Sequence, residues 1–272
     1  MIKNIIVPSD FSPCAENAAD YAAGLALKTG AQILLFHSAY VRFSEGAMLV
    51  DYSDQIRSVS EEYLSQEVDR ITKKYPQLST KITSKLALGT LDEELNHLIK
   101  KGGYDLIVMG TKGRSAWEEL LLGSETARII DAAKVPVLAV PPAFAFGTAE
   151  KIVFASSLEE RLSNADEQMV RTFMGDTAEI HIYHNYEDYT DIDPEKEQAL
   201  LNEFHQHFKQ YIDLDLSFNT NNVDSIEGYA ESLGADFLIV RKTHQPFLQE
   251  LFRVSISKGL SYRAKMPLLV LH

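Results

Sequence analysis

Three glycines at fixed spacing mark the segment of the chain best suited to ligand chemistry. Two residues separate Gly110 from Gly113, and nine more separate Gly113 from the pair Gly123 and Ser124. Glycine lets the main chain approach a ligand, or take a positive φ, without steric cost. Since Gly123 and Ser124 precede a segment of helical spacing, unpaired N–H groups at a helix start are expected beside them, where phosphate oxygens bind well.

Two cationic side chains lie inside the same segment. Lys112 and Arg114 are expected to act as counter-charge for a triphosphate in an otherwise acidic chain. Glycine-rich turns after strands also occur without a ligand, and Ser124 alone is explained as a helix N-cap. The three glycines after a buried strand and ahead of a helix favour a phosphate site.

A second polar element, Pro8-Ser9-Asp10, follows the first apolar run of the chain. The carboxylate of Asp10 can accept a hydrogen bond from a ribose hydroxyl or an adenine amino group. It can equally serve as the N-cap or turn acceptor of the next helix. The sequence leaves these two roles open.

The elements that must position these residues alternate between short apolar runs and longer segments of helical spacing. This alternation predicts βαβ units with a parallel sheet between helices, and such open sheets bind ligands where the winding direction reverses. The site is therefore expected beyond the first and fourth strands. In the first half the expected strands are residues 2–7, 33–37, 81–86, 106–109 and 135–140, and the expected helices are residues 15–28, 61–74, 91–101 and 126–133.

The chain contains two copies of this unit. At an offset of 147, KNIIVPSDFS from Lys3 matches EKIVFASSLE from Glu150, and His37 falls on His184. At an offset of 131, DLIVMG at 105–110 matches DFLIVR at 236–241. The change from 147 to 131 makes the second copy 16 residues shorter between its second and fourth strands, as a trimmed loop or helix would. The predicted domains are 1–147 and 148–272.

These motifs resemble the universal stress protein family in its tandem two-domain form. The glycine segment matches that family's ATP-binding pattern G-x(2)-G-x(9)-G-[ST] without a substitution, and Pro8-x-Asp10 matches the element after its first strand. The resemblance covers nearly the whole chain. It implies two tandem Rossmann-like α/β domains of the adenine nucleotide alpha-hydrolase-like type, each an open five-stranded parallel sheet with helices on both faces.

The resemblance also implies a ligand, ATP, with Mg²⁺ carried by its phosphates. Asp10 and the main chain around Ser38 are expected near the adenine, and Gly110 and Thr111 near the ribose. The residues implied around the phosphates are Gly113, Arg114, Gly123, Ser124 and Glu125. The predicted binding set is completed by Pro8 and Ser9, and it includes no catalytic residue and no protein ligand for a metal.

The second copy departs from the pattern, because all three glycines and the aspartate are replaced. The residues at these positions are Arg241, His244 and Val254 at the offset of 131 and Ser157 at the offset of 147, while Ser255 retains the serine. Residues 148–272 hold 11 basic and 21 acidic side chains, against 15 and 18 in residues 1–147. This charge repels polyphosphate. We expect nucleotide in the first domain only, with a small anion or merely a solvated loop in the second.

The charged-residue content of the chain argues against two classes of binding partner. The chain has 39 acidic and 26 basic side chains, a formal charge of -13, which disfavours nucleic acid and anionic membrane surfaces. No apolar stretch approaches the ~20 residues that span a bilayer. The single cysteine, Cys14, and the early proline and aspartate in the first ten residues favour a cytoplasmic location without a signal peptide.

Three functions remain, of which a regulatory protein that binds ATP with little hydrolysis is favoured over an enzyme. A related hydrolase would carry a Ser-Gly-Gly-x-Asp-Ser loop where this chain has Ser9-Asp10-Phe11-Ser12, and a Walker G-x(4)-G-K-[ST] sequence is also missing. The third function is a ligand-free dimerisation scaffold. The last strands of the copies, 136–140 and 267–271, are expected to pair as an intramolecular pseudo-dimer, with a homodimer as a further possibility.

The histidines of the second half give only a weak indication of a metal site. His181 and His184 lie three apart on an expected strand, so they face opposite sides, and His205 and His207 diverge on an expected helix. Neither pair makes a zinc site alone, and a site assembled across strands stays open.

Overall fold

The computed structural model describes residues 1–39, 49–112, 123–142, 144–156, 158, 161–186, 188–218, 222–242 and 265–272, with side chains except at 49–53 and 222–225. Contacts between Cα atoms divide the chain into two compact units. The first unit holds most of residues 2–146, and the second holds residues 147–272.

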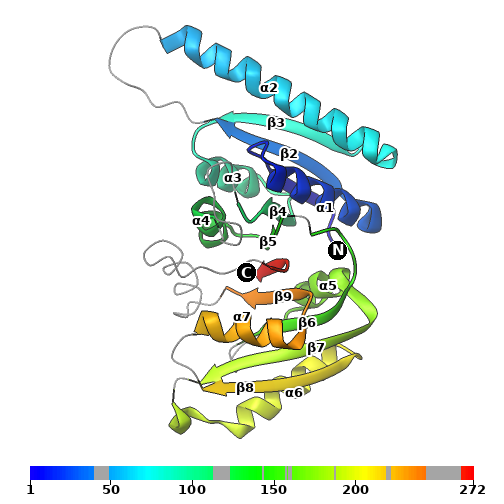
Figure 1. Cartoon of the computed structure of the whole chain (residues 1–272), viewed down its shortest axis with the longest axis vertical. Coiled ribbons are helices and arrows are strands. Elements are labelled where there is room, and N and C mark those ends of the chain that lie inside the picture. Colours follow the sequence, from blue (N-terminus) through cyan, green and yellow to red (C-terminus); the bar gives the residue numbers. More distant parts are fainter. Residues whose placement is uncertain are drawn as a thin grey trace. The chain divides into compact units, whose positions relative to one another are not determined.

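The first unit is a parallel sheet with the strand order β3-β2-β1-β4-β5 (Figure 1). Helices α1 and α2 pack together, and α3 packs with α4. Because the chain winds from β1 to β3 in one direction and from β4 to β5 in the other, the winding reverses between β1 and β4. The elements are β1 (Asn4–Pro8), α1 (Pro13–Thr29), β2 (Gln32–Ala39), α2 (Leu49–Lys74), the 3-10 turn η1 (Pro76–Leu78), β3 (Ile82–Leu88), α3 (Leu91–Lys100), β4 (Leu106–Gly110), α4 (Ser124–Ala132) and β5 (Val137–Val140).

Helix α1 shows how local sequence sets these boundaries. Ser12 is its N-cap, with the hydroxyl oxygen accepting the N–H of Ala15 at 3.2 Å, and proline follows in the first turn. Gly30 ends the helix in the left-handed region at φ 78° and donates its N–H to Ala26. Nine of its residues are buried, six of them alanine, and these small side chains let the helix lie close to strands β1, β2, β4 and β5.

Helix α2 corrects one sequence expectation. It was expected to start near residue 61, but it begins at Leu49. The side chains of residues 54–59 are almost all exposed. A turn that buries nothing has no apolar periodicity, so the sequence carried no signal for it.

The second unit repeats this architecture with the strand order β10-β9-β6-β7-β8. Helix α6 has 14 residues where α2 has 26, which accounts for most of the 16 residues missing from the second copy. The elements are β6 (Ala149–Ala155), α5 (Asn164–Phe173), β7 (Met174–Tyr186), the 3-10 turn η2 (Tyr189–Asp191), α6 (Pro194–His207), β8 (Tyr211–Phe218), α7 (Asn222–Leu233), β9 (Phe237–Arg241) and β10 (Leu268–Leu271).

Helices cover both faces of this second sheet. Phe204 of α6 packs on Phe154, with ring centroids 5.0 Å apart. Tyr229 of α7 packs on Tyr183, also at 5.0 Å. Phe154 pairs with Ile182 across the strands, so Phe154 and Tyr183 point to opposite faces. Each half is thus an open five-stranded parallel sheet between helices, and the predicted fold class is confirmed.

The two copies also repeat individual contacts. Asp105 accepts the backbone N–H groups of Lys3 and Asn4 at 2.7 and 2.9 Å, and Asp236 accepts the two equivalent N–H groups in the second unit. His37 Nδ1 lies 2.7 Å from the carbonyl oxygen of Ser9. His184 Nδ1 lies 3.0 Å from the carbonyl oxygen of Ser156. A carbonyl cannot donate, so Nδ1 carries the proton in both contacts.

The half-buried His184 is expected to make the stability of the second unit fall in acid. Burial lowers the pKa of His184 because the imidazolium is poorly solvated there. Its contribution to stability is therefore complete above the unfolded pKa of about 6.5 and is lost as the pH falls below it. We expect the urea midpoint to fall between about pH 7.5 and about pH 5.5, and His184→Asn to show a smaller fall. Equal falls in both proteins would exclude this contribution.

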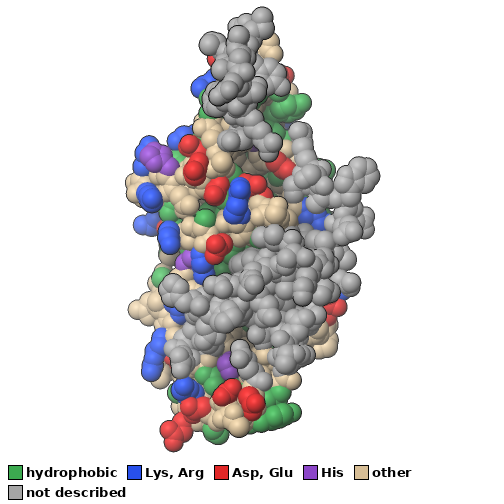
Figure 2. All heavy atoms as spheres, turned by 90° about the vertical axis from the view of Figure 1, so that its left-hand side faces the viewer, with side chains coloured by type: hydrophobic (Ala, Val, Ile, Leu, Met, Phe, Trp, Pro, Cys, Tyr) green, Lys and Arg blue, Asp and Glu red, His purple; other side chains and the backbone are tan. Residues whose placement is uncertain are grey.

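The surface shows mixed charge. On the face drawn in Figure 2, the described residues carry both acidic and basic side chains. Among the described helices, none is long and apolar enough to cross a bilayer.

Candidate functional site

The carboxyl ends of β1 and β4 meet where the winding of the first sheet reverses. The two strands pair directly, with Ile5 opposite Leu106 and Ile6 opposite Ile107. Strand β1 ends at Pro8 and β4 ends at Gly110, so the two predicted motifs leave neighbouring strands at the same edge. This edge is where an open α/β sheet binds ligands.

The chain after β4 is fixed to the start of α4. Thr111 is fully buried, and its N–H donates to the carbonyl of Val140 at 3.1 Å. The carbonyl oxygen of Thr111 accepts the N–H of Gly123 at 2.6 Å. A second hydrogen bond joins the same two segments, because the hydroxyl of Thr126 donates to the carbonyl oxygen of Gly110 at 3.0 Å. The two ends of the glycine segment are therefore held together, while residues 113–122 lie outside the described residues.

Helix α4 begins with an N-cap that leaves its first turn open. The N-cap is Gly123, which makes no side-chain capping bond. The N–H groups of the first helical turn, those of Ser124, Glu125 and Thr126, have no acceptor inside the helix. With the positive end of the helix dipole, they form a suitable place for an anion. The N–H of Gly123 is not one of these groups, because it donates to the carbonyl oxygen of Thr111.

Packing against helix α1 explains why residue 110 is glycine, whereas the sequence analysis explained it by the approach of a ligand. A Cβ atom at Gly110 would lie 2.8 Å from Cys14 Sγ and 3.0 Å from the main-chain carbonyl carbon and oxygen of Cys14. The absence of a side chain therefore lets helix α1 approach β4. Ligand approach is not needed to explain this glycine.

The chain after β1 forms a tight polar turn. Asp10 Oδ1 accepts the N–H of Ser12 at 3.1 Å, and Ser9 Oγ accepts the N–H of Phe11 at 3.1 Å. Of the two local roles considered for Asp10, the turn acceptor is right and the N-cap is wrong, because Ser12 caps α1. Phe11 takes a positive φ of 60°, which is uncommon for a residue with a side chain.

Ser38 and Glu125 place their side chains away from a ligand role. The hydroxyl of Ser38 donates to the carbonyl oxygen of Gly89 at 2.6 Å. The carboxylate of Glu125 pairs with Arg128 at 2.9 Å within the same helix. Each side chain thus already has one partner within the protein. The predicted residues Gly113 and Arg114 lie outside the described residues.

The second unit fills the equivalent place with a side chain. Arg241 stands where the first unit has Gly110, and its guanidinium donates to the carbonyl oxygen of Arg161, the counterpart of Cys14. The same guanidinium pairs with the buried Asp166 at 2.9 Å. Asp166 in turn caps the start of α5 together with Ser163. Because Asp166 neutralises Arg241, this arginine is not available to hold an anion alone.

Two residues near the end of β1, Phe11 and His37, were not among those predicted for the site. Phe11 packs against His37 at 4.6 Å and against Tyr63 at 5.3 Å between ring centroids, so an aromatic cluster lies at the end of β1. The signal for His37 was available, because it coincides with His184 in the internal repeat. Phe11 gave no such signal, because its φ is a property of the folded turn.

Comparison with protein families gives a match over slightly more than half of the chain. Residues 1–141 match the model of the universal stress protein family. A universal stress protein of Methanocaldococcus jannaschii is 25% identical over 154 residues, which cover 52% of this chain and 95% of that protein.

Two solved structures match over nearly the full length. A universal stress protein from Archaeoglobus fulgidus has a TM-score of 0.69 at 18% identity, covering 98% of this chain and 95% of that one. A functionally unknown protein from Pseudomonas aeruginosa has a TM-score of 0.59 at 14% identity, covering 99% and 92%. At these identities the likeness shows the fold, which extends through both units.

Proposed function

The chain belongs to the universal stress protein family, and from this premise we propose that it is a regulatory protein that binds ATP in its first unit. Hydrolysis is slow or absent in this proposal. Binding ATP orders the segment that follows β4 and so alters a surface that a partner protein reads.

The start of α4 carries the proposal. It follows the complete G-x(2)-G-x(9)-G-S sequence, and its first-turn N–H groups are left open by a glycine N-cap. The hydrogen bond between Gly123 and Thr111 holds this helix start beside the end of β4. A phosphate group placed here meets several donors that need no rearrangement, which lowers the cost of binding.

In this proposal the nucleotide lies along the carboxyl edge of the first sheet, with its adenine at β1 and β2 and its phosphates at the start of α4. The adenine lies beyond β1 and β2, near Asp10 and the main chain of Ser38, with Pro8 at the end of β1 and Ser9 directly after it. The ribose lies near Gly110 and Thr111. The phosphates, with the Mg²⁺ that they carry, lie near Gly113, Arg114, Gly123, Ser124 and Glu125.

The second unit binds no nucleotide in this proposal. The ion pair between Arg241 and Asp166 occupies the place of Gly110, and residues 148–272 carry a net charge of -10 from 11 basic and 21 acidic side chains. Both features oppose a triphosphate. The domain limits 1–147 and 148–272, the intramolecular pseudo-dimer, a homodimer and the cytoplasmic location remain predictions from the sequence.

Calorimetry with a product assay tests this function. ATP with Mg²⁺ is titrated into the purified full chain, and the same mixture is then assayed for ADP and AMP. We expect one ATP per chain and little product over many binding lifetimes. Rapid release of AMP would identify a hydrolase instead, and the absence of binding by a folded protein would leave only a scaffold function.

A further inference from the structure

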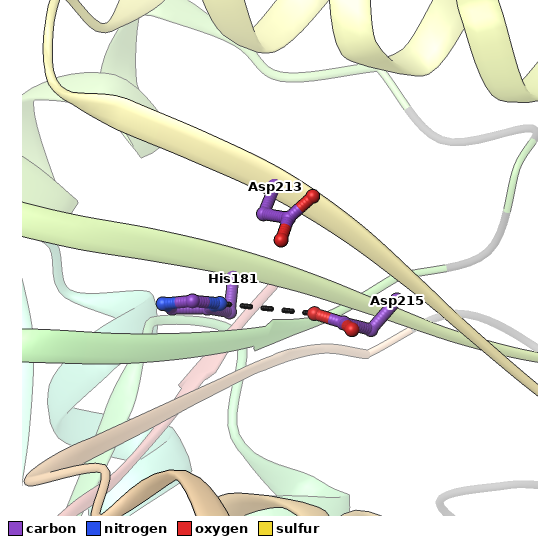
Figure 3. A group of neighbouring side chains, drawn as sticks. All are labelled: His181, Asp213 and Asp215. Atoms are coloured by element: carbon purple, nitrogen blue, oxygen red, sulfur yellow. Dashed lines mark ion pairs between the residues drawn. The ribbon is translucent and has the colours of Figure 1, made fainter.

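Three side chains that can bind a metal converge in the second unit, far in sequence from the glycine segment. They are His181 on β7 and Asp213 and Asp215 on β8, and one ligand atom from each lies within 4.8 Å of the other two. His181 is paired with Asp213 in the strand register, and Asp215 lies two residues further on the same face of β8. Figure 3 shows the carboxylate of Asp215 directed at the imidazole of His181, with Asp213 beside them and one of its oxygens pointing toward the pair.

The imidazole of His181 is held between two acidic partners. The side chain is only 9% exposed. Its Nδ1 atom lies 3.7 Å from Asp215 Oδ2, and its Nε2 atom lies 3.4 Å from Glu179 Oε2. Both separations exceed the 2.7–3.2 Å range of good N–H···O hydrogen bonds. The ring is therefore oriented by its neighbours without being closely bonded to either.

Tyr229 of α7 fixes one of the carboxylates. Its hydroxyl donates to Asp215 and lies 3.4 Å from His181 Nδ1. A carboxylate held by such an outer hydrogen bond is oriented before any ion arrives.

The charge of this cluster is not balanced within the described part of the chain. Glu179, Asp213 and Asp215 face the same ring, and no described lysine or arginine forms an ion pair with any of the three. Carboxylates this close repel one another. A bound divalent cation relieves that repulsion.

We propose that His181, Asp213 and Asp215 bind one divalent transition-metal ion, of which Zn²⁺ is the reference case. The ligands are His181 Nδ1 and one oxygen of each carboxylate, with Glu179 accepting the proton of His181 Nε2. A mixed nitrogen and oxygen set suits Zn²⁺, Mn²⁺ or Co²⁺, whereas Ca²⁺ and Mg²⁺ prefer oxygen alone. The ion joins β7 to β8, the outermost strand of the second sheet.

The distances are compatible with such a site. Two donors bound at ~2.0–2.2 Å to one tetrahedral ion lie roughly 3.4 Å apart. The pair formed by His181 and Asp215 needs a change of a few tenths of an ångström from its 3.7 Å separation. The widest separation, up to 4.8 Å, closes by rotation of a partly exposed aspartate side chain. A fourth position is left for water, as in zinc sites with three protein ligands.

Zinc titration of the chelator-treated full chain tests the proposal, with any affinity tag removed and no nucleotide present. We expect one Zn²⁺ per chain and a higher thermal midpoint with Zn²⁺ than without it. His181→Gln and Asp213→Asn should each weaken binding by about tenfold or more. Co²⁺ in place of Zn²⁺ should give an absorption spectrum that is lost in His181→Gln.

His207→Gln is the matched control. His207 Nδ1 also contacts a carboxylate, that of Glu167 at 2.8 Å, but no further carboxylate among the described residues completes a ligand set there. This variant should bind Zn²⁺ like the wild type. Asp213→Asn changes a partly exposed residue on an edge strand, so it remains informative if His181→Gln does not fold.

The proposal fails if the folded wild type takes up no Zn²⁺, or if Asp213→Asn binds it as tightly as the wild type does. It is independent of the nucleotide site. Gly123→Val, which changes only the first unit, should bind Zn²⁺ with unchanged affinity, so loss of ATP binding and loss of Zn²⁺ binding are separate outcomes.

Discussion

Gly123→Val is expected to lower the affinity for ATP by at least about tenfold, equivalent to ~1.4 kcal/mol, while the protein stays folded. A Cβ atom at Gly123 would lie 3.2 Å from the carbonyl oxygen of Thr111 and 3.6 Å from the Cα atom of Lys112. The two methyl groups of valine add to this crowding. They push the start of α4 away from β4, break the 2.6 Å hydrogen bond to Thr111 and misalign the open N–H groups.

Calorimetric titration with ATP and Mg²⁺ measures the effect, and a glycine elsewhere provides the control. A Cβ atom at Gly147 meets no atom within 4 Å, and its φ is not in the left-handed region. Gly147→Val should therefore bind ATP as the wild type does. Wild-type affinity in Gly123→Val would show that the phosphates do not bind at the start of α4.

Gly110→Ala is expected to destabilise the first unit by about 1–3 kcal/mol, the usual cost of overpacking a core. The added methyl group would be 2.8 Å from Cys14 Sγ and 3.0 Å from the main-chain carbonyl of Cys14. Strand β4 is buried along its whole length, so neither strand nor helix moves aside freely. Urea unfolding without nucleotide measures the loss.

Adding Cys14→Ala separates the two sources of the strain. This second change removes the sulfur but leaves the main-chain carbonyl, so the double variant should recover only part of the stability. Gly147→Ala is the control for a glycine with open space. If Gly110→Ala were as stable as the wild type, the close approach of α1 to β4 would not explain this glycine.

Periodicity was enough to predict the architecture. The alternation of buried strands and helices, together with the two offsets of the internal repeat, predicted two five-stranded parallel sheets. Both sheets have the expected strand pairing within each unit. The start of α2 was missed because residues 54–59 bury almost no side chains, and such a solvated stretch leaves no apolar stripe in the sequence.

The site was predicted less completely, because residue type does not reveal which atom a side chain meets. The spacing predicted that Gly110 ends the fourth strand and that Gly123 precedes a helix, and both glycines lie there. It did not reveal that a Cβ atom at Gly110 would collide with Cys14. The replacement of Gly110 by Arg241 predicted a changed second site without predicting Asp166 as its partner. Likewise, His181 meets Asp213 and Asp215 only through the β7–β8 register, which the sequence did not specify.

A crystal structure of the full chain grown with ATP and Mg²⁺ tests the central claim most directly. We predict one nucleotide per chain, in the first unit, with its phosphates on the N–H groups of Ser124 and Glu125. Nucleotide bound in the second unit, or phosphates of a bound nucleotide placed away from α4, would contradict it.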